Sequence, residues 1–131
     1  MKYISTRDNT KEYNFEQVFI KGLADDGGLY VPKTLKKFSA EELIKLKNLN
    51  YNALSTEIIS LFSEDFISKE ELSSLIKKSY STFREKEVVK ISNVGEMKLL
   101  ELFHGPTLAF KDVAMQFIGN LYEYYLNKND K

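Results

Sequence analysis

The chain has 131 residues, 43% of them hydrophobic and 29% charged, which is the ordinary balance of a soluble domain that buries a core of its own. Its 19 basic and 19 acidic residues cancel, which argues against nucleic acid as the main partner. Zero cysteines exclude disulfides and thiolate metal sites, and a histidine-based metal site would depend wholly on His104, so we expect no metal. No apolar run approaches the roughly 18 residues of a membrane span and the start lacks an apolar signal core, so we expect a cytoplasmic protein without a membrane anchor.

The beginning of the chain predicts two short strands on either side of a helix. Tyr3–Thr6 has the composition and alternation of a short strand. Asn14 is a suitable cap for a helix that ends near Gly22. Leu29–Val31 is a second extended piece, and Pro32 ends it.

Three further helices are predicted from capping signals and apolar spacing. Ser39 and Glu42 have the spacing of a capping box, and so do Ser68 and Glu71. Between these two starts, the segment Tyr51–Phe62 carries apolar residues at helical intervals. We expect these helices to pack together as a core.

The character of the chain changes after the third of these helices. Glu87–Ile91 and Met97–Leu102 both resemble strands, and Asn93–Glu96 between them can turn, which predicts a hairpin. A last helix is expected from about Val113 to Leu126.

These elements predict an α+β chain in two parts. Residues 1–86 would form a mostly helical part with short strands, and residues 87–131 would hold the hairpin, a lysine-containing loop and the last helix. Apolar and aromatic side chains recur in that helix at positions that suit a core or an interface: Phe117, Leu121, Tyr124 and Tyr125.

The segment LELFHGPTLAFKD, Leu100–Asp112, concentrates unusual residues in one loop. Gly105 and the proline after it stop the strand, and Asp112 is a candidate N-cap for the last helix, which puts Lys111 directly before that cap. The positive end of a helix and apolar neighbours such as Phe110 both favour the neutral amine, the form that attacks a carbonyl. Lys111 is therefore a candidate Schiff-base residue, although the same pattern fits a solvated surface lysine, the commoner case.

Two other polar residues of this loop have more than one interpretation. His104 suits a loop residue that packs on Phe103 and hydrogen-bonds the backbone, and it also suits a catalytic group. Thr107 can satisfy the backbone of the turn or contact a ligand.

Three motifs together resemble the threonine synthase family. LELFHGPTLAFKD resembles the lysine segment of that family, GLADDGGLYVP (Gly22–Pro32) its second N-terminal signature, and YISTR (Tyr3–Arg7) its opening. They follow one another in the family's order over residues 3 to 112.

The resemblance implies a fold and an activity. Threonine synthases are two-domain α/β enzymes of the tryptophan synthase β-like class that use pyridoxal 5'-phosphate. They convert O-phospho-L-homoserine and water to L-threonine and phosphate. By this resemblance Lys111 holds the cofactor as a Schiff base and moves protons at the substrate carbons, with Phe110 and Asp112 as its cofactor-binding neighbours. Residues 104–107 match the loop that shapes the pocket wall.

The resemblance also implies that the chain is one part of an active site. The family's phosphate-binding loop follows the lysine helix, and nothing in these residues resembles it. We therefore expect the N-terminal portion of a longer enzyme, inactive alone, whose partner is the missing C-terminal domain. Two alternatives are a phospholyase-like relative, which releases phosphate without making threonine, and a non-catalytic interaction module.

Overall fold

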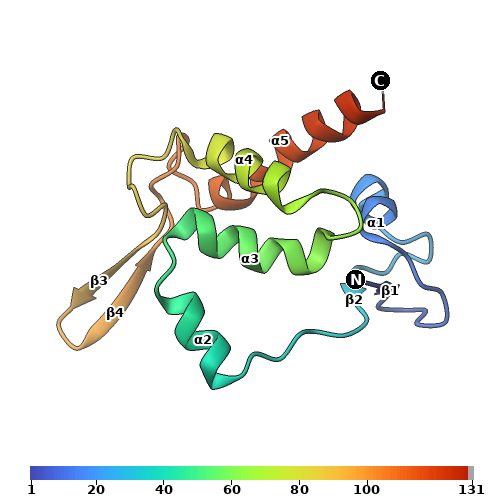
Figure 1. Ribbon diagram of the computed structural model, residues 1–131, viewed down its shortest axis with the longest axis horizontal. Coiled ribbons are helices and arrows are strands. Elements are labelled where there is room, and N and C mark those ends of the chain that lie inside the picture. Colours follow the sequence, from blue (N-terminus) through green and yellow to red (C-terminus); the bar gives the residue numbers. More distant parts are fainter. Residues whose placement is uncertain (130–131) are drawn as a thin grey trace. The chain divides into compact units, whose positions relative to one another are not determined.

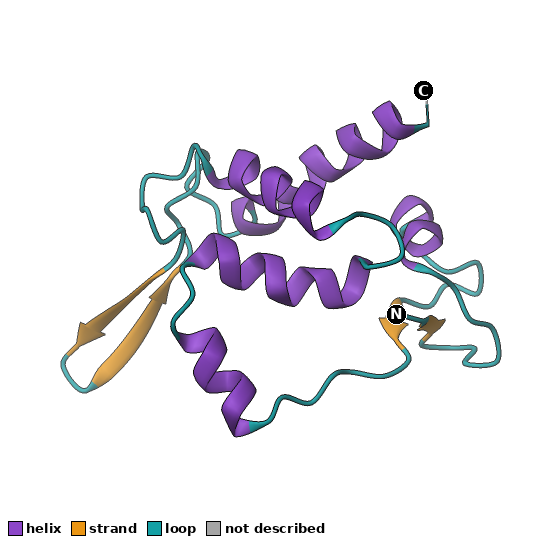
Figure 2. Ribbon diagram, viewed as in Figure 1, coloured by secondary structure: helices purple, strands orange, loops and turns teal. Residues whose placement is uncertain are grey.

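The computed structural model describes residues 1–129 as a mixture of helices and two small antiparallel sheets, which confirms the α+β class (Figures 1 and 2). Their order along the chain is β1 (Tyr3–Ser5), α1 (Phe15–Lys21), β2 (Tyr30–Pro32), α2 (Ala40–Lys47), α3 (Tyr51–Ser63), α4 (Lys69–Tyr80), β3 (Lys90–Val94), β4 (Met97–Glu101) and α5 (Asp112–Lys128). The chain forms two compact units. The first holds residues 1–49 and 53–72, and the second holds residues 50–52 and the chain from Ser73 onward.

Helices α1, α2 and α4 begin where their capping signals predict. In α2 the Ser39 hydroxyl accepts a hydrogen bond from the Glu42 backbone N–H, and the Glu42 carboxylate accepts one from the Ser39 N–H. Asn14 and Gln17 form the same reciprocal pair before α1, and a serine–glutamate pair forms it before α4. Each box satisfies N–H groups that have no partner inside a helix.

The core of the first unit is built on the short β1–β2 sheet and an aromatic cluster. Strand β1 pairs with β2 in antiparallel register, with Tyr3 opposite Pro32. The buried Tyr3 donates its hydroxyl to the Phe62 carbonyl at 2.8 Å, and its ring lies 6.2 Å from that of Phe15. Phe15 in turn lies 5.5 Å from Phe66. The predicted first strand therefore serves to seat an aromatic side chain in the core.

In the second unit the buried face of α5 packs against the end of α4. The Tyr80 hydroxyl donates to the Val113 carbonyl at 2.9 Å, and the Asn120 side chain donates to the Ser79 hydroxyl at 3.0 Å. Leu121 is buried, whereas the aromatic residues predicted to share its face are half-buried. The aromatic run predicted in the last helix therefore faces the core of this unit.

The predicted hairpin exists, but its first strand is shifted. Strand β3 begins at Lys90, not at Glu87, because Val88 turns inward with φ 63° and is buried, which breaks the extended conformation. The turn is the two-residue Gly95–Glu96 pair, since Val94 lies opposite Met97. Gly95 has φ 61°, a conformation that glycine adopts at little cost in tight hairpin turns.

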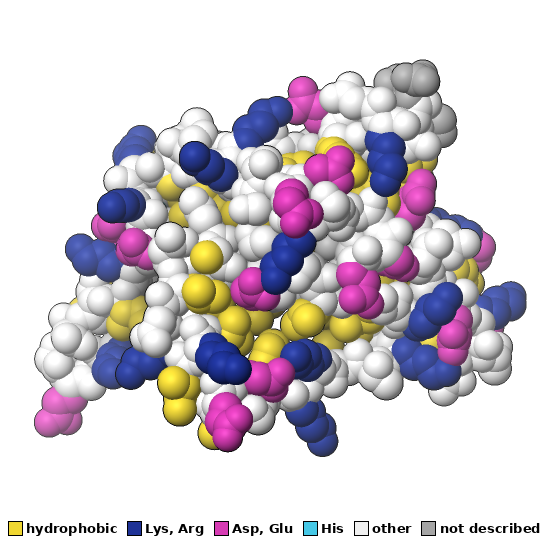
Figure 3. All heavy atoms as spheres, viewed as in Figure 1, with side chains coloured by type: hydrophobic (Ala, Val, Ile, Leu, Met, Phe, Trp, Pro, Cys, Tyr) yellow, Lys and Arg dark blue, Asp and Glu magenta, His cyan; other side chains and the backbone are white. Residues whose placement is uncertain are grey.

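The surface carries both signs of charge. On the face drawn in Figure 3, acidic and basic side chains alternate with scattered apolar ones, which agrees with the zero formal net charge. Across residues 1–129, no helix combines the length and the apolar character that crossing a bilayer requires.

A substitution in α4 tests how much the fold depends on its buried face. Leu72→Ala should lower the free energy of unfolding by about 2–5 kcal/mol, because this side chain is 0% exposed and truncation leaves a cavity. The control Leu43→Ala should change it by no more than about 0.5 kcal/mol, because Leu43 is 55% exposed. Urea unfolding followed by far-UV circular dichroism measures both, and equal losses would contradict this assignment of the core.

Candidate functional site

The candidate site is the lysine loop, residues 104–111, between β4 and α5. Helix α5 begins at Asp112, and Lys111 stands immediately before it with helical angles (φ −62°, ψ −23°) and no side-chain cap. The predicted N-cap role of Asp112 is therefore wrong. Its carboxylate turns back into the loop, where Oδ2 accepts hydrogen bonds from the Thr107 N–H and hydroxyl, both at 2.8 Å.

The Asp112 carboxylate organises the second half of the loop. The residue is 3% exposed, and Gly105 lies so close that a Cβ there would be 2.4 Å from the Asp112 Cβ. Burial by itself raises the pKa of Asp112, but the hydrogen bonds from Thr107 and Gln116 outweigh burial and hold the pKa below its usual value. The loop is thus folded around an ionised carboxylate.

The first half of the loop is held by a second carboxylate. His104 Nε2 lies 2.7 Å from Glu101 Oε2, and the His104 ring lies 4.7 Å from that of Phe103. The packing of His104 on Phe103 is as predicted, but the polar partner of its side chain is the Glu101 carboxylate and not the backbone. Hydrogen bonds from Ser92 and then from His104 lower the pKa of Glu101.

Sequence reasoning missed Glu101 and Ser92. They lie on facing strands, and the register that opposes Lys90 to Glu101 puts Ser92 on the same face of the hairpin. A two-residue turn at Gly95 would have fixed this register from the sequence, whereas the four-residue turn we predicted left it open.

The Lys111 side chain is exposed at the end of this folded loop. Its carbonyl accepts the N–H groups of Ala114 and Met115 at 3.1 and 2.8 Å, so its backbone belongs to the first turn of α5. Its amine makes no ion pair within residues 1–129. The apolar pocket expected around it is absent from the described residues, because Phe110 is 65% exposed. The chain therefore presents a free amine on a fixed backbone.

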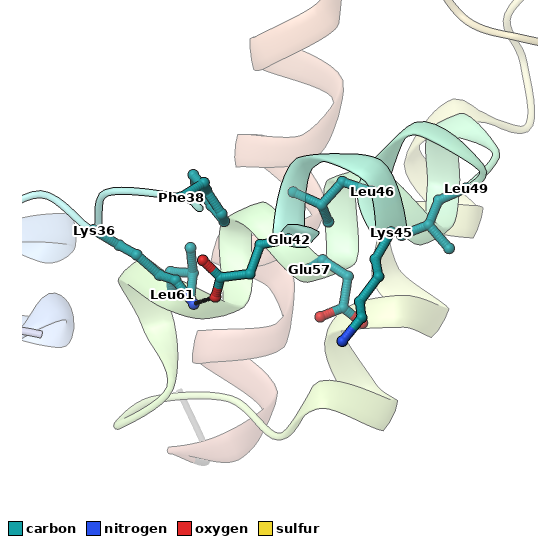
Figure 4. A pocket seen from close by; sticks show the side chains of 8 residues that line it. All are labelled: Lys36, Phe38, Glu42, Lys45, Leu46, Leu49, Glu57 and Leu61. Atoms are coloured by element: carbon teal, nitrogen blue, oxygen red, sulfur yellow. Dashed lines mark ion pairs between the residues drawn. The ribbon is translucent and has the colours of Figure 1, made fainter. Parts of the chain in front are cut away.

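A pocket in the first unit does not involve the lysine loop. Figure 4 shows its lining, in which apolar side chains lie among charged ones whose Lys36–Glu42 ion pair measures 2.7 Å. At its other side, Glu57 pairs with Lys69 at 2.6 Å. The lining residues are Lys36, Phe38, Glu42, Lys45, Leu46, Leu49, Glu57 and Leu61.

Comparison with known proteins agrees with the sequence motifs. A family model described as "Threonine synthase N terminus" matches residues 2–80. The threonine synthase of Schizosaccharomyces pombe is 39% identical over 99% of this chain and 26% of its own length. The human protein named threonine synthase-like 2 is 37% identical over 100% of this chain and 28% of its own length.

A solved structure gives the same result for the fold. The crystal structure of pyridoxal-phosphate-bound threonine synthase from Brucella melitensis superimposes with a TM-score of 0.93 at 36% identity, over 100% of this chain and 28% of that one. The chain thus spans about a quarter of the length of the proteins it matches, and it has the fold of their N-terminal part.

Paired glycine substitutions test the packing of the loop. Gly105→Ala should lower the free energy of unfolding by roughly 1–3 kcal/mol, because its Cβ would overlap the Asp112 side chain. Gly119→Ala should raise it by up to about 1 kcal/mol, because a Cβ there meets nothing within 4 Å and alanine favours a helix. Thermal and urea unfolding measure both effects. A neutral Gly105→Ala variant would show that the carboxylate does not occupy this position.

The Asp112 carboxylate should also leave a signature in acid. A folded-state pKa below the unfolded value contributes stability that is present above the unfolded pKa of about 3.9 and is lost as pH falls through the folded pKa. The stability gap between the parent and Asp112→Asn should therefore be constant near neutral pH and close below about pH 4. In a Thr107→Val background, which lacks the hydroxyl donor, Asp112→Asn should cost less stability than in the parent chain. Urea titrations across pH measure it, and a gap that persists at low pH would contradict the assignment.

Proposed function

Because this chain belongs to the threonine synthase family, we propose that it is the N-terminal part of a pyridoxal-phosphate-dependent lyase that converts O-phospho-L-homoserine and water to L-threonine and phosphate. The observation that carries the proposal is the exposed Lys111 amine at the end of a loop held by two carboxylates. A lysine that reacts with a carbonyl needs an accessible amine and a fixed backbone, and Lys111 has both.

The residues present fit the attachment of pyridoxal 5'-phosphate at Lys111. When bound, the cofactor supplies the electron sink for carbanion chemistry. In our proposal Lys111 holds the cofactor covalently, and its amine takes and returns protons at the substrate carbons. Phe110 presents an exposed ring beside it. Asp112 supports the site through the backbone, because its carboxylate is already engaged with Thr107.

We assign the remaining site to the C-terminal part of the same polypeptide, as in relatives about four times as long as this chain. In this assignment residues 87–131 lead into that part, and residues 1–86 are the mostly helical N-terminal portion. The C-terminal part would cover the outer face of α5. Met115, Tyr122 and Leu126 are exposed there at helical spacing on the Lys111 side of the helix. Without that part the chain should be inactive. We propose a cytoplasmic location as well.

A second candidate is a phospholyase-like activity. The chain is about as similar to the human threonine synthase-like 2 protein, at 37% identity, as to the S. pombe threonine synthase, at 39%. Proteins named threonine synthase and proteins named threonine synthase-like thus match this chain about equally, so the product has to be assigned by assay. The lysine loop serves both activities, because both begin at the same amine.

An assay on the complete coding sequence that contains these residues tests the proposal. We expect threonine and phosphate in equal amounts from O-phospho-L-homoserine. Lys111→Ala should lower the rate by on the order of 10²–10⁴-fold or more, because the amine that moves protons is gone. Lys98→Ala, at an exposed lysine of the hairpin, should stay within about twofold. Borohydride reduction and peptide mass spectrometry should locate the cofactor on Lys111.

The products separate the three candidates. Phosphate without threonine would support the phospholyase-like alternative. The absence of phosphate release and of cofactor on Lys111 would refute both enzymes and favour an interaction module. Phosphate release by residues 1–131 alone would contradict the assignment of the remaining site to the C-terminal part.

A further inference from the structure

The shielded polar side chains of the β3–β4 hairpin lie next to the start of the lysine loop and bond to it. Every residue of the two strands is exposed except Ser92 and Glu101, which are partly buried. A hairpin that served only to cover a core would bury apolar side chains, yet Ile91 and Leu100 are exposed. The shielded part of this hairpin is a hydroxyl and a carboxylate.

Glu101 connects the hairpin to the loop through both of its oxygens. Oε1 accepts the Ser92 hydroxyl from the facing strand, and Oε2 lies 2.7 Å from His104 Nε2. The side chains of His104 and Glu101 are only 18% and 14% exposed, so water competes weakly for this contact. Ser92 fixes the orientation of the carboxylate, which fixes the ring.

The order of these groups excludes a nucleophile triad. In a triad the imidazole lies between the hydroxyl and the carboxylate and takes the hydroxyl proton. Here the carboxylate lies between Ser92 and His104, so the hydroxyl has no imidazole to activate it. The arrangement can hold a position, but it does not generate a nucleophile.

His104 is also held at its backbone and its ring face. Its carbonyl accepts the Arg84 N–H at 2.9 Å, and its ring packs on Phe103. Further along the loop, the Leu108 N–H bonds the Gly105 carbonyl at 3.2 Å, and Asp112 binds Thr107. Because the loop is short and has its own hydrogen bonds, we expect a shift of the His104 backbone to shift the Lys111 backbone as well.

We propose that Glu101 and His104 are positioning residues for Lys111, with Glu101 tying the hairpin to the first residue of the lysine loop and Asp112 holding its far end. The effect on catalysis rests on the proposed function. The tie itself is a property of this chain and is testable without turnover.

Two backbone amides report the two ends of the loop separately. The Arg84 N–H bonds the His104 carbonyl, and the Thr107 N–H bonds the Asp112 carboxylate. Hydrogen exchange at single residues, followed by nuclear magnetic resonance on the 131-residue chain, reads both. His104→Phe keeps a ring against Phe103 and removes the bond to Glu101. His104→Gln keeps an N–H donor at the position of Nε2.

We expect His104→Phe to speed exchange at Arg84 by about tenfold, the usual consequence of losing one hydrogen bond to a charged group. His104→Gln should stay within about threefold of the parent, and Glu101→Leu should match His104→Phe. Asp112→Asn should act mainly at Thr107. Amides in the middle of α4 should change in none of these variants, which separates a local effect from global unfolding.

The enzyme arm uses the complete coding sequence. His104→Phe should lower kcat/KM by about tenfold, and His104→Gln should restore most of it. Unchanged exchange at Arg84 in His104→Phe, or equal losses in His104→Phe and His104→Gln, would overturn the proposal. A parent that makes no threonine would refute the proposed function, while the exchange arm would still decide on the tie.

Discussion

The buried carboxylate of Asp112 is the constraint on which the rest of the lysine loop depends. The carboxylate of a residue that is only 3% exposed must be hydrogen-bonded, because burying a charge without partners is unfavourable. Its partner, Thr107, reaches it only because the chain turns back on itself after Gly105. That return allows no side chain at Gly105 and puts Leu108 at φ 66°, a conformation that non-glycine residues rarely adopt. The glycine, the threonine and the aspartate of this segment therefore form one structural unit.

These three residues fix the backbone that carries the Lys111 amine, but they do not provide the surroundings that would make the amine reactive. Hydrogen bonds to Asp112 and Glu101 fix the loop from inside the chain. The surroundings that would remove water from the Lys111 amine are not among the described residues, since Phe110 is exposed beside it. The chain thus contributes geometry, and the proposed function requires another part of the enzyme to contribute the environment.

The sequence predicted well the features that are decided within a few residues. In the capping boxes, Ser39 and Ser68 each lie three residues from the glutamate that completes the box, so local chemistry alone predicts where these helices start. Two other features depend on residues far apart in the sequence and could not be predicted in this way. Packing in the core decides the inward turn of Val88, and the register of the hairpin decides the Ser92–Glu101 hydrogen bond. Asp112 belongs to the same class: aspartate is a good cap by propensity, but the loop folds back and its carboxylate accepts the N–H and hydroxyl of Thr107 instead.

The exposed face of α5 links these observations to the proposed function. Met115, Tyr122 and Leu126 lie on the Lys111 side of the helix, so a part that covered this face as far as Met115 would also approach the amine. Covering an amine removes water from it, and desolvation favours the neutral form that attacks a carbonyl. An enzyme built in this way would gain its reactive lysine only when its two parts meet. The loop can be rigid beforehand, since its own carboxylates hold it, and so assembly need change only the solvent around the amine.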